Sequence, residues 1–140
     1  MKVYLATPMN GKSIDEIKTK IADCASELAK IGLDFYNPFL ELVAKDNSVD
    51  GIVQDRKPIE MLCSSAKNIE DCDAILFIGK IEDLKKSRGC QVEVLIAVNY
   101  DKACYLFNEK EITKLDSLKM TWEISDQVNK EELQNGIRTL

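Results

Sequence analysis

A carboxylate stands inside a segment that otherwise reads as an apolar helix. Glu93 lies within SRGCQVEVLIAV, residues 87–98, and Gly89 precedes it by one helical turn on the same face. Ile96 and Ala97, one turn further on, offer no counter-charge. Because a buried charge needs a partner or a function, Glu93 is the best catalytic candidate in the chain. A salt bridge to a distant lysine or arginine is the structural alternative.

The chain contains no histidine, which narrows the chemistry open to it. Histidine-based triads, histidine general bases and mixed Cys/His metal sites are excluded. Acid–base chemistry must come from carboxylates, tyrosine, lysine or cysteine. The cysteine count is odd and no CxxC pair occurs, so we expect reduced, mostly buried thiols rather than a metal site or disulfides. The five are Cys24, Cys63, Cys72, Cys90 and Cys104. No cofactor is implied.

Composition predicts one globular domain, residues 1–140, of 45% hydrophobic and 31% charged residues. No apolar run approaches the ~20 residues of a membrane helix, and the N-terminus does not read as a signal peptide, so we expect a cytosolic protein without a membrane partner. The net charge of −5 argues against a nucleic-acid polymer as partner. A small anionic ligand remains possible at a helix N-terminus.

Strand and helix patterns alternate along the chain. Short apolar runs predict strands at 2–6, 33–36, 74–78 and 103–107. A capping box of Ser13 and Glu16 predicts a helix that ends at Gly32, and Pro58 begins another that continues to Ile69. Residues 39–44 suggest a helical turn, 45–51 a polar loop and 82–86 a charged loop. After Asn108 we expect a short helix, a fifth strand near 120–124 and a closing helix from about 129.

This alternation predicts an α/β fold, a three-layer α/β/α sandwich with a mainly parallel, Rossmann-like (flavodoxin-like) sheet of four to five strands. In such sheets ligands bind at the carboxyl ends of the strands, at the topological switch point. Residues 7–12, the loop after Ile78 and the helix that starts at Ser87 should converge there.

The segment ATPMNGKS, residues 6–13, also fits a loose phosphate-loop pattern between a strand and a helix. Pro8 removes a backbone N–H that a phosphate cradle would use. The strand at 74–78 is followed by Gly79, so no Asp is placed there to hold magnesium. A phosphate-loop NTPase is therefore the less favoured function.

A set of ordered motifs offers a better interpretation. VYLATPMNG at 3–11, DCDAI at 71–75 and S-x-G-x-x-x-E at 87–93, with Ala97 beyond, resemble the nucleoside 2-deoxyribosyltransferase superfamily. The chain looks closest to the 2′-deoxynucleoside 5′-monophosphate N-glycosidase branch and to small phage-type relatives. The resemblance covers residues 2–107, and Met120-Thr121-Trp122 through Ser125-Asp126 is similar to a further segment of the transferases.

The resemblance implies a role for individual residues. Glu93 would be the nucleophile that holds the sugar covalently, and Tyr4, at the end of the first strand, would orient it. Ser87 would donate to a phosphate, together with free N–H groups near Gly89. Helix capping by Ser87 and core packing by Tyr4 are the structural alternatives. The remaining implied residues are Met9 and Gly11, which would line the sugar or phosphate, and Ser117 and Met120, which would reach across a homodimer with shared sites.

The implied function is cleavage of the N-glycosidic bond of a small nucleoside or nucleoside 5′-monophosphate, as a hydrolase or a transferase, through a covalent glycosyl-Glu intermediate. One position departs from the family. Ser65 stands where the family has the Asp that protonates the departing base, and losing such an acid costs ~10²–10⁴-fold. Asp55, Glu60 or Asp71 would have to substitute. Otherwise the protein is a non-catalytic nucleotide-binding module on the same fold.

Overall fold

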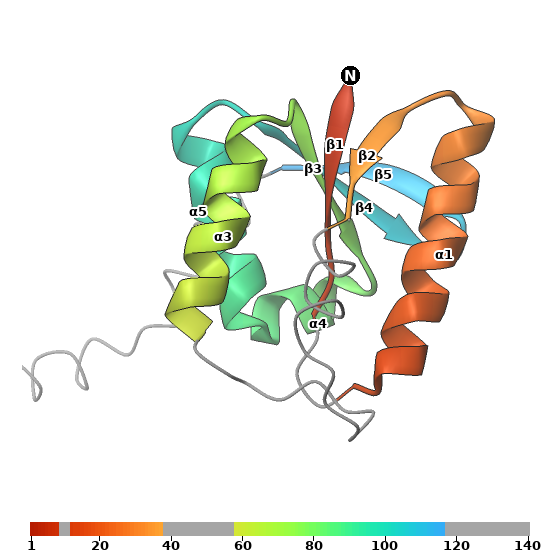
Figure 1. The fold of residues 1–140 in the computed structure, drawn as a ribbon, viewed down its shortest axis with the longest axis horizontal. Helices are drawn as coiled ribbons and strands as arrows, with labels where there is room; N and C mark the ends of the chain where they lie inside the picture. Colours follow the sequence, from red (N-terminus) through yellow and green to blue (C-terminus); the bar gives the residue numbers. More distant parts are fainter. Residues whose placement is uncertain (9–11, 38–57, 117–140) are drawn as a thin grey trace, which may run out of the picture.

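The computed structural model describes residues 1–8, 12–37 and 58–116, which form a five-stranded sheet flanked by helices (Figure 1). The strands follow the order β2-β1-β3-β4-β5, with β4 and β5 antiparallel and every other neighbouring pair parallel. Their bounds are β1 Lys2–Ala6, β2 Asp34–Tyr36, β3 Ala74–Ile78, β4 Ala103–Asn108 and β5 Glu111–Leu115. The predicted mainly parallel sheet is therefore confirmed.

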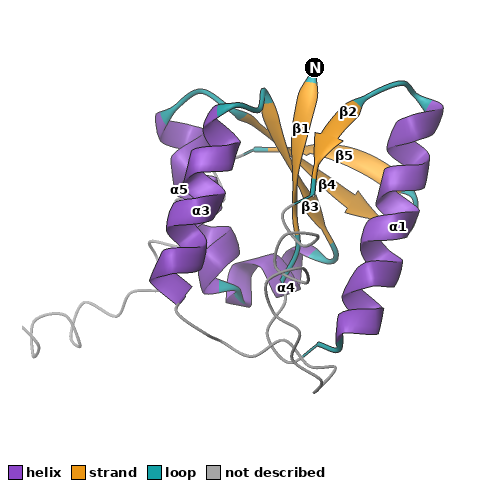
Figure 2. Cartoon of the chain, in the orientation of Figure 1, coloured by secondary structure: helices purple, strands orange, loops and turns teal. Residues whose placement is uncertain are grey.

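Helices cover both faces of this sheet, which makes the predicted three-layer sandwich (Figure 2). Helix α1 (Ile14–Lys30) packs on one face, where its apolar side chains meet those of β1, β3 and Phe107 of β4. Helices α3 (Pro58–Glu70) and α5 (Arg88–Asn99) lie side by side on the other face, over Tyr4 of β1 and Phe77 of β3. The chain thus has two apolar cores, one on each side of the sheet.

Helix α1 forms where its sequence signals predicted. The Ser13 hydroxyl accepts a hydrogen bond from the backbone N–H of Glu16 at 3.1 Å, so one of the unpaired amides of the first turn is satisfied. Apolar residues at helical spacing then face the sheet and are buried: Ile17, Ile21, Cys24 and Leu28. Gly32 follows the helix with a φ of 72°, a left-handed conformation that glycine adopts without the steric cost of a Cβ.

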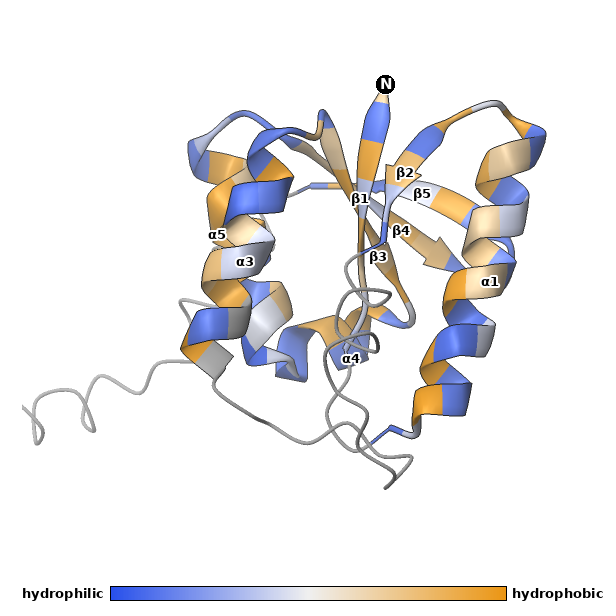
Figure 3. Ribbon diagram, viewed as in Figure 1, coloured by the Kyte–Doolittle hydropathy of each residue, from blue (hydrophilic) through white to orange (hydrophobic). Residues whose placement is uncertain are grey.

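Strand β3 is the centre of the sheet. All five residues from Ala74 to Ile78 are buried, because helices cover both of its faces. Figure 3 shows the apolar colour concentrated along the central strands, while the helices alternate between apolar and polar residues. The bounds of β3 and of β1 match the predicted ranges 74–78 and 2–6. The strand predicted at 33–36 begins one residue later, and that predicted at 103–107 ends one residue later.

The prediction of a charged loop at 82–86 is wrong, because residues Ile81–Lys86 form the short helix α4. Leu84 is buried and fixes this turn against the core. The charges are also ordered along the helix, with Glu82 and Asp83 in the first turn and two lysines in the last, which complements the helix dipole. That ordering was the signal that the sequence analysis missed.

The prediction of a short helix after Asn108 is also wrong, since β5 follows β4 there as a hairpin. Glu109 and Lys110 form the turn with φ values of 51° and 65°, the left-handed conformation that a two-residue hairpin turn requires. Neither is Gly or Asn, so the usual hairpin signal was absent from the sequence. The helical turn at 39–44, the loop at 45–51, the strand near 120–124 and the closing helix lie outside the described residues.

Four of the five cysteines are buried and Cys63 is exposed; none of the five is joined in a disulfide. Burial raises the pKa of the Cys24 and Cys90 thiols to about 12, which keeps both protonated. Within the ranges that the structure describes, no helix is long and apolar enough to cross a lipid bilayer.

Candidate functional site

The described ends of the predicted loop at 7–12, Thr7 and Lys12, lie near the end of β3 and the start of α5 respectively. The Thr7 hydroxyl, just after β1, donates to the carbonyl of Ile78 at the end of β3, at 3.4 Å. Lys12 lies close enough to the start of α5 to lower the pKa of Cys90. Burial has the larger effect, so the pKa of this thiol is raised overall. In the strand order of this sheet, β1 and β3 flank the topological switch point, where ligands of such folds bind.

Glu93 is the one charged or polar residue that is buried in the described part of the chain, and the residue is 8% exposed. No described residue hydrogen-bonds its Oε2, and no described lysine or arginine forms an ion pair with it. The structural alternative of a salt bridge therefore has no support among these residues. Burial raises the pKa of the Glu93 carboxyl from its ordinary 4.5 to about 8, so it is held largely protonated at neutral pH.

Gly89 leaves the approach to this carboxyl open. A Cβ placed on Gly89 would lie 3.9 Å from Oε1 of Glu93 and 3.8 Å from Cδ2 of Leu62 on α3. Both are ordinary van der Waals distances, so a methyl group would fit there and would cover the carboxyl. The one-turn spacing read from the sequence thus matches the geometry, and Leu62 is a neighbour that the sequence analysis did not identify.

Tyr4 lies beside Glu93, but in the middle of β1 and not at its end as predicted, because the strand continues through Ala6. Its hydroxyl donates to Oγ of Ser65 at 2.9 Å. Burial and then the Glu93 charge raise the pKa of Tyr4, so this phenol stays protonated. Its ring stacks on Tyr36 of β2 with 5.9 Å between centroids, a neighbour that sequence reasoning also missed.

Ser65 is placed within this cluster, in contact with Tyr4 from the facing helix α3. The two described carboxylates considered as substitutes, Glu60 and Asp71, have no contact with Tyr4 or Glu93 among the interactions of the described residues. Asp71 is exposed and follows the last residue of α3, next to Cys72 and at the amino edge of the sheet. Glu60 is exposed in the first turn of α3, and Asp55 lies outside the described residues.

Ser87 caps helix α5, as its structural alternative predicted. Its hydroxyl accepts from the backbone N–H of Cys90 at 3.3 Å, and its carbonyl accepts from the N–H of Gln91 at 3.0 Å. The hydroxyl also hydrogen-bonds the side chain of Cys90, which lowers the pKa of that thiol against the larger effect of burial. The other predicted binding residues, Met9, Gly11, Ser117 and Met120, lie outside the described part of the chain.

Removal of the Tyr4 hydroxyl should show how much the hydrogen bond from Tyr4 on β1 to Ser65 on α3 contributes to stability. We expect Tyr4→Phe to lower the free energy of unfolding by ~1–2 kcal/mol, because it leaves a half-buried Ser65 hydroxyl without its donor. Ser65→Ala should cost a similar amount. Since the two residues share one hydrogen bond, the double variant should cost less than the sum, by ~0.5–1.5 kcal/mol. Urea titrations of all four proteins measure this, and strictly additive losses would refute the link.

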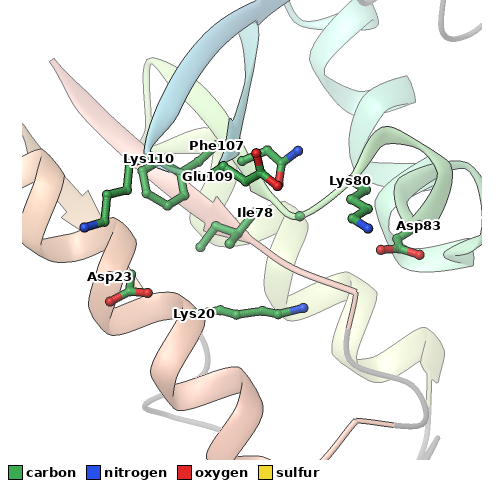
Figure 4. A pocket seen from close by; sticks show the side chains of 10 residues that line it. Lys20, Asp23, Ile78, Lys80, Asp83, Phe107, Glu109 and Lys110 are labelled. Atoms are coloured by element: carbon green, nitrogen blue, oxygen red, sulfur yellow. The ribbon is translucent and has the colours of Figure 1, made fainter.

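A hollow lies on the face of the sheet opposite to Glu93, against α1. It is a groove of about 340 Å³ at the carboxyl ends of β3 and β4. Figure 4 shows Lys20 and Asp23 of α1 on one side of it and Lys80 and Asp83 on the other. None of the described site residues lines it. Among residues 1–8, 12–37 and 58–116, no group of three or more His, Cys, Asp or Glu could hold a metal ion.

The strand order and the two helical layers define a Rossmann-like α/β fold, in which the topological switch point lies between β1 and β3. In a search of solved structures, the chain is similar to a 2-deoxyribosyltransferase from the psychrotolerant bacterium Bacillus psychrosaccharolyticus. The TM-score is 0.51 and the identity 16%, over 95% of this chain and 96% of that chain. At this identity the likeness shows a shared fold. No protein-family model and no curated protein sequence matches the chain.

Proposed function

We propose that this protein cleaves the N-glycosidic bond of small nucleosides or nucleoside 5′-monophosphates, with Glu93 as the nucleophile. The observation that carries the proposal is the buried Glu93 carboxyl, whose Oε2 has no partner among the described residues. Such a group costs stability unless it has a partner, and perturbed, unpartnered carboxyls of this kind gather at functional sites. The fold shared with a 2-deoxyribosyltransferase supports the same class of reaction.

The proposed reaction has two steps. The Glu93 carboxyl gives up its proton and attacks the anomeric carbon, the bond to the base breaks, the departing base takes up one proton, and the sugar is held as an ester on Glu93. Water or a second base then releases the sugar, which makes the protein a hydrolase or a transferase. The developing oxocarbenium charge stabilises the carboxylate in the transition state and not in the free protein, which is the difference that catalysis needs.

Incubation with a panel of nucleosides and nucleoside monophosphates, both ribosides and 2′-deoxyribosides, tests the proposal directly. Chromatography should detect free base, and addition of a second base should reveal a transferase by a new nucleoside. Release of base at equal rates by wild type and by Glu93→Ala would exclude the mechanism.

Gly89→Ala should separate stability from activity. The new methyl group meets Leu62 and Glu93 only at van der Waals distance, so the fold should be kept or stabilised by up to ~1 kcal/mol. Because the methyl group covers Oε1 of Glu93, we expect kcat/KM to fall by about tenfold or more, roughly the cost of one misplaced contact at a reacting centre. The control is Arg88→Ala, an exposed neighbour in the same turn, which should leave both quantities nearly unchanged. Full activity in Gly89→Ala would mean that the substrate does not approach the Glu93 carboxyl over Gly89.

A non-catalytic nucleotide-binding module is the second candidate, and the identity of Ser65 favours it. A hydroxyl that accepts from Tyr4 cannot replace a carboxylic acid as proton donor. Thermal stabilisation by a nucleotide without turnover would support this candidate.

A phosphate-loop NTPase is the least favoured function. It predicts magnesium-dependent hydrolysis of a nucleoside triphosphate that is lost in Lys12→Ala.

We further propose that the protein acts in the cytosol as a homodimer or a higher homo-oligomer with shared sites. Ser117 and Met120 would then reach a neighbouring subunit's site, and Ser87, Met9 and Gly11 would hold the sugar or a 5′-phosphate. Sedimentation of the purified protein measures the oligomeric state. Mixing of inactive Glu93→Ala and Met120→Ala subunits should restore part of the activity if sites are shared.

A further inference from the structure

The walls around Glu93 that the structure describes are uncharged. Tyr4 and Cys90 are the described titratable groups whose pKa values respond to Glu93, and burial raises the pKa of both. Both therefore stay neutral at physiological pH. Ser65 adds a hydroxyl and Leu62 an apolar side chain. Among these described neighbours, Glu93 itself is the one group able to carry charge, and the Lys12 ammonium acts on the Cys90 side of the site.

A positive charge on the ligand is what this site favours most. A cation within about 4–6 Å of a buried carboxyl favours its ionised form by ~10–10³-fold. Such a ligand would convert the largely protonated Glu93 into the carboxylate that attacks the sugar. A neutral ligand offers no such compensation until the bond has begun to break.

The departing base poses a second requirement. A neutral base leaves with an excess electron pair and needs a proton, whereas a base that already carries a positive charge leaves as a neutral molecule. The proton of the Tyr4 hydroxyl is donated to Ser65, and neither hydroxyl is an acid near neutral pH. The described contacts around Glu93 therefore suit a leaving group that needs no proton.

We propose that the substrates are N-glycosides whose base is positively charged, such as pyridinium or 7-alkylpurinium nucleosides, and that Ser65 at the Tyr4 hydroxyl sets this specificity. This inference rests on the proposed N-glycosidase function. It adds a substrate class that the shared fold does not specify.

The reaction balances without an acid. Glu93 Oε bonds to the anomeric carbon while the bond from that carbon to the ring nitrogen breaks, and its electron pair neutralises the positive base. Water then attacks the anomeric carbon of the ester. The sugar leaves with a hydroxyl group, the carboxylate is restored, and one proton passes to solvent.

Matched substrate pairs test the charge requirement. We would compare nicotinamide riboside with its neutral 1,4-dihydro form, and 7-methylguanosine with guanosine, each also as the 2′-deoxyriboside. Free base is measured by chromatography after subtraction of the rate without protein. We expect the cationic member of each pair to be cleaved at least ~10²-fold faster, the lower bound of an acid's contribution. Glu93→Gln should remove this cleavage.

Replacement of Ser65 tests the specificity. Ser65→Asp places a carboxyl group next to Tyr4 and should raise turnover of the neutral substrates by tenfold or more, without a gain for the cationic ones. Ser65→Asn has nearly the same shape without an acidic proton and is the control, in which the preference should persist. An unchanged preference in Ser65→Asp overturns the role of Ser65.

The outcomes separate the two proposals. Glu93-dependent cleavage of neutral nucleosides at rates equal to the cationic ones overturns the inference and leaves the N-glycosidase function standing. Cleavage of neither class overturns both. Cleavage restricted to the cationic members, in wild type and in Ser65→Asn alike, supports both.

Discussion

Glu93→Gln should remove N-glycosidase activity and leave the fold intact. Gln has nearly the shape of Glu but cannot form an ester with the anomeric carbon, so the two-step reaction has no first step. Loss of a covalent nucleophile lowers kcat by at least ~10³-fold. We would measure release of base under single-turnover conditions and, after acid quenching, the intact mass of the protein. Wild type should carry a glycosyl adduct and Glu93→Gln none.

The control for this experiment is Glu70→Gln, the same chemical change at an exposed position at the end of α3. It should keep the wild-type rate and adduct. Activity of Glu93→Gln within threefold of wild type, in a folded protein, would remove Glu93 from the reaction and refute the covalent glycosyl-Glu mechanism.

Local signals predicted most of the fold, because they act over a few residues. The capping box at Ser13 and Glu16 forms as predicted, and the apolar run from Ala74 to Ile78 is the buried central strand. The prediction failed for two segments whose structure depends on one or two residues. A single buried Leu84 makes α4 out of a charged segment, and the β4–β5 turn uses Glu109 and Lys110 in a conformation usually left to Gly or Asn.

Part of the site was predictable because two of its residues are close in the sequence. Gly89 and Glu93 lie one turn apart in one helix, so their spacing alone set the open face above the carboxyl. The contact between Tyr4 and Ser65 joins residues 61 positions apart and depends on how α3 packs over β1. No pattern in a single sequence encodes that contact. It became visible only with the layers in place.

The buried carboxyl should also make the protein lose stability as pH rises, in a way that Glu93→Gln abolishes. The pKa of Glu93 is about 8 in the folded chain and about 4.5 when unfolded. Between these values the folded state binds more protons than the unfolded state, so the free energy of unfolding falls with increasing pH. The contribution of Glu93 is complete below pH 4.5 and is lost above pH 8. We expect a loss of about 3–5 kcal/mol over this range.

Urea denaturation of wild type and Glu93→Gln from pH 5 to pH 9 isolates this effect, because all other groups titrate alike in both proteins. The groups that face Glu93 from the neighbouring elements do not change the stability difference between the two proteins over this pH range. Tyr4 on β1 and Cys90 on α5 have raised pKa values and keep their protons throughout, and Ser65 on α3 does not titrate. Glu93→Gln should gain stability relative to wild type as the pH rises. A constant difference between the two proteins would mean that Glu93 already ionises near its ordinary pKa. In that case a counter-charge outside the described residues would have to satisfy it.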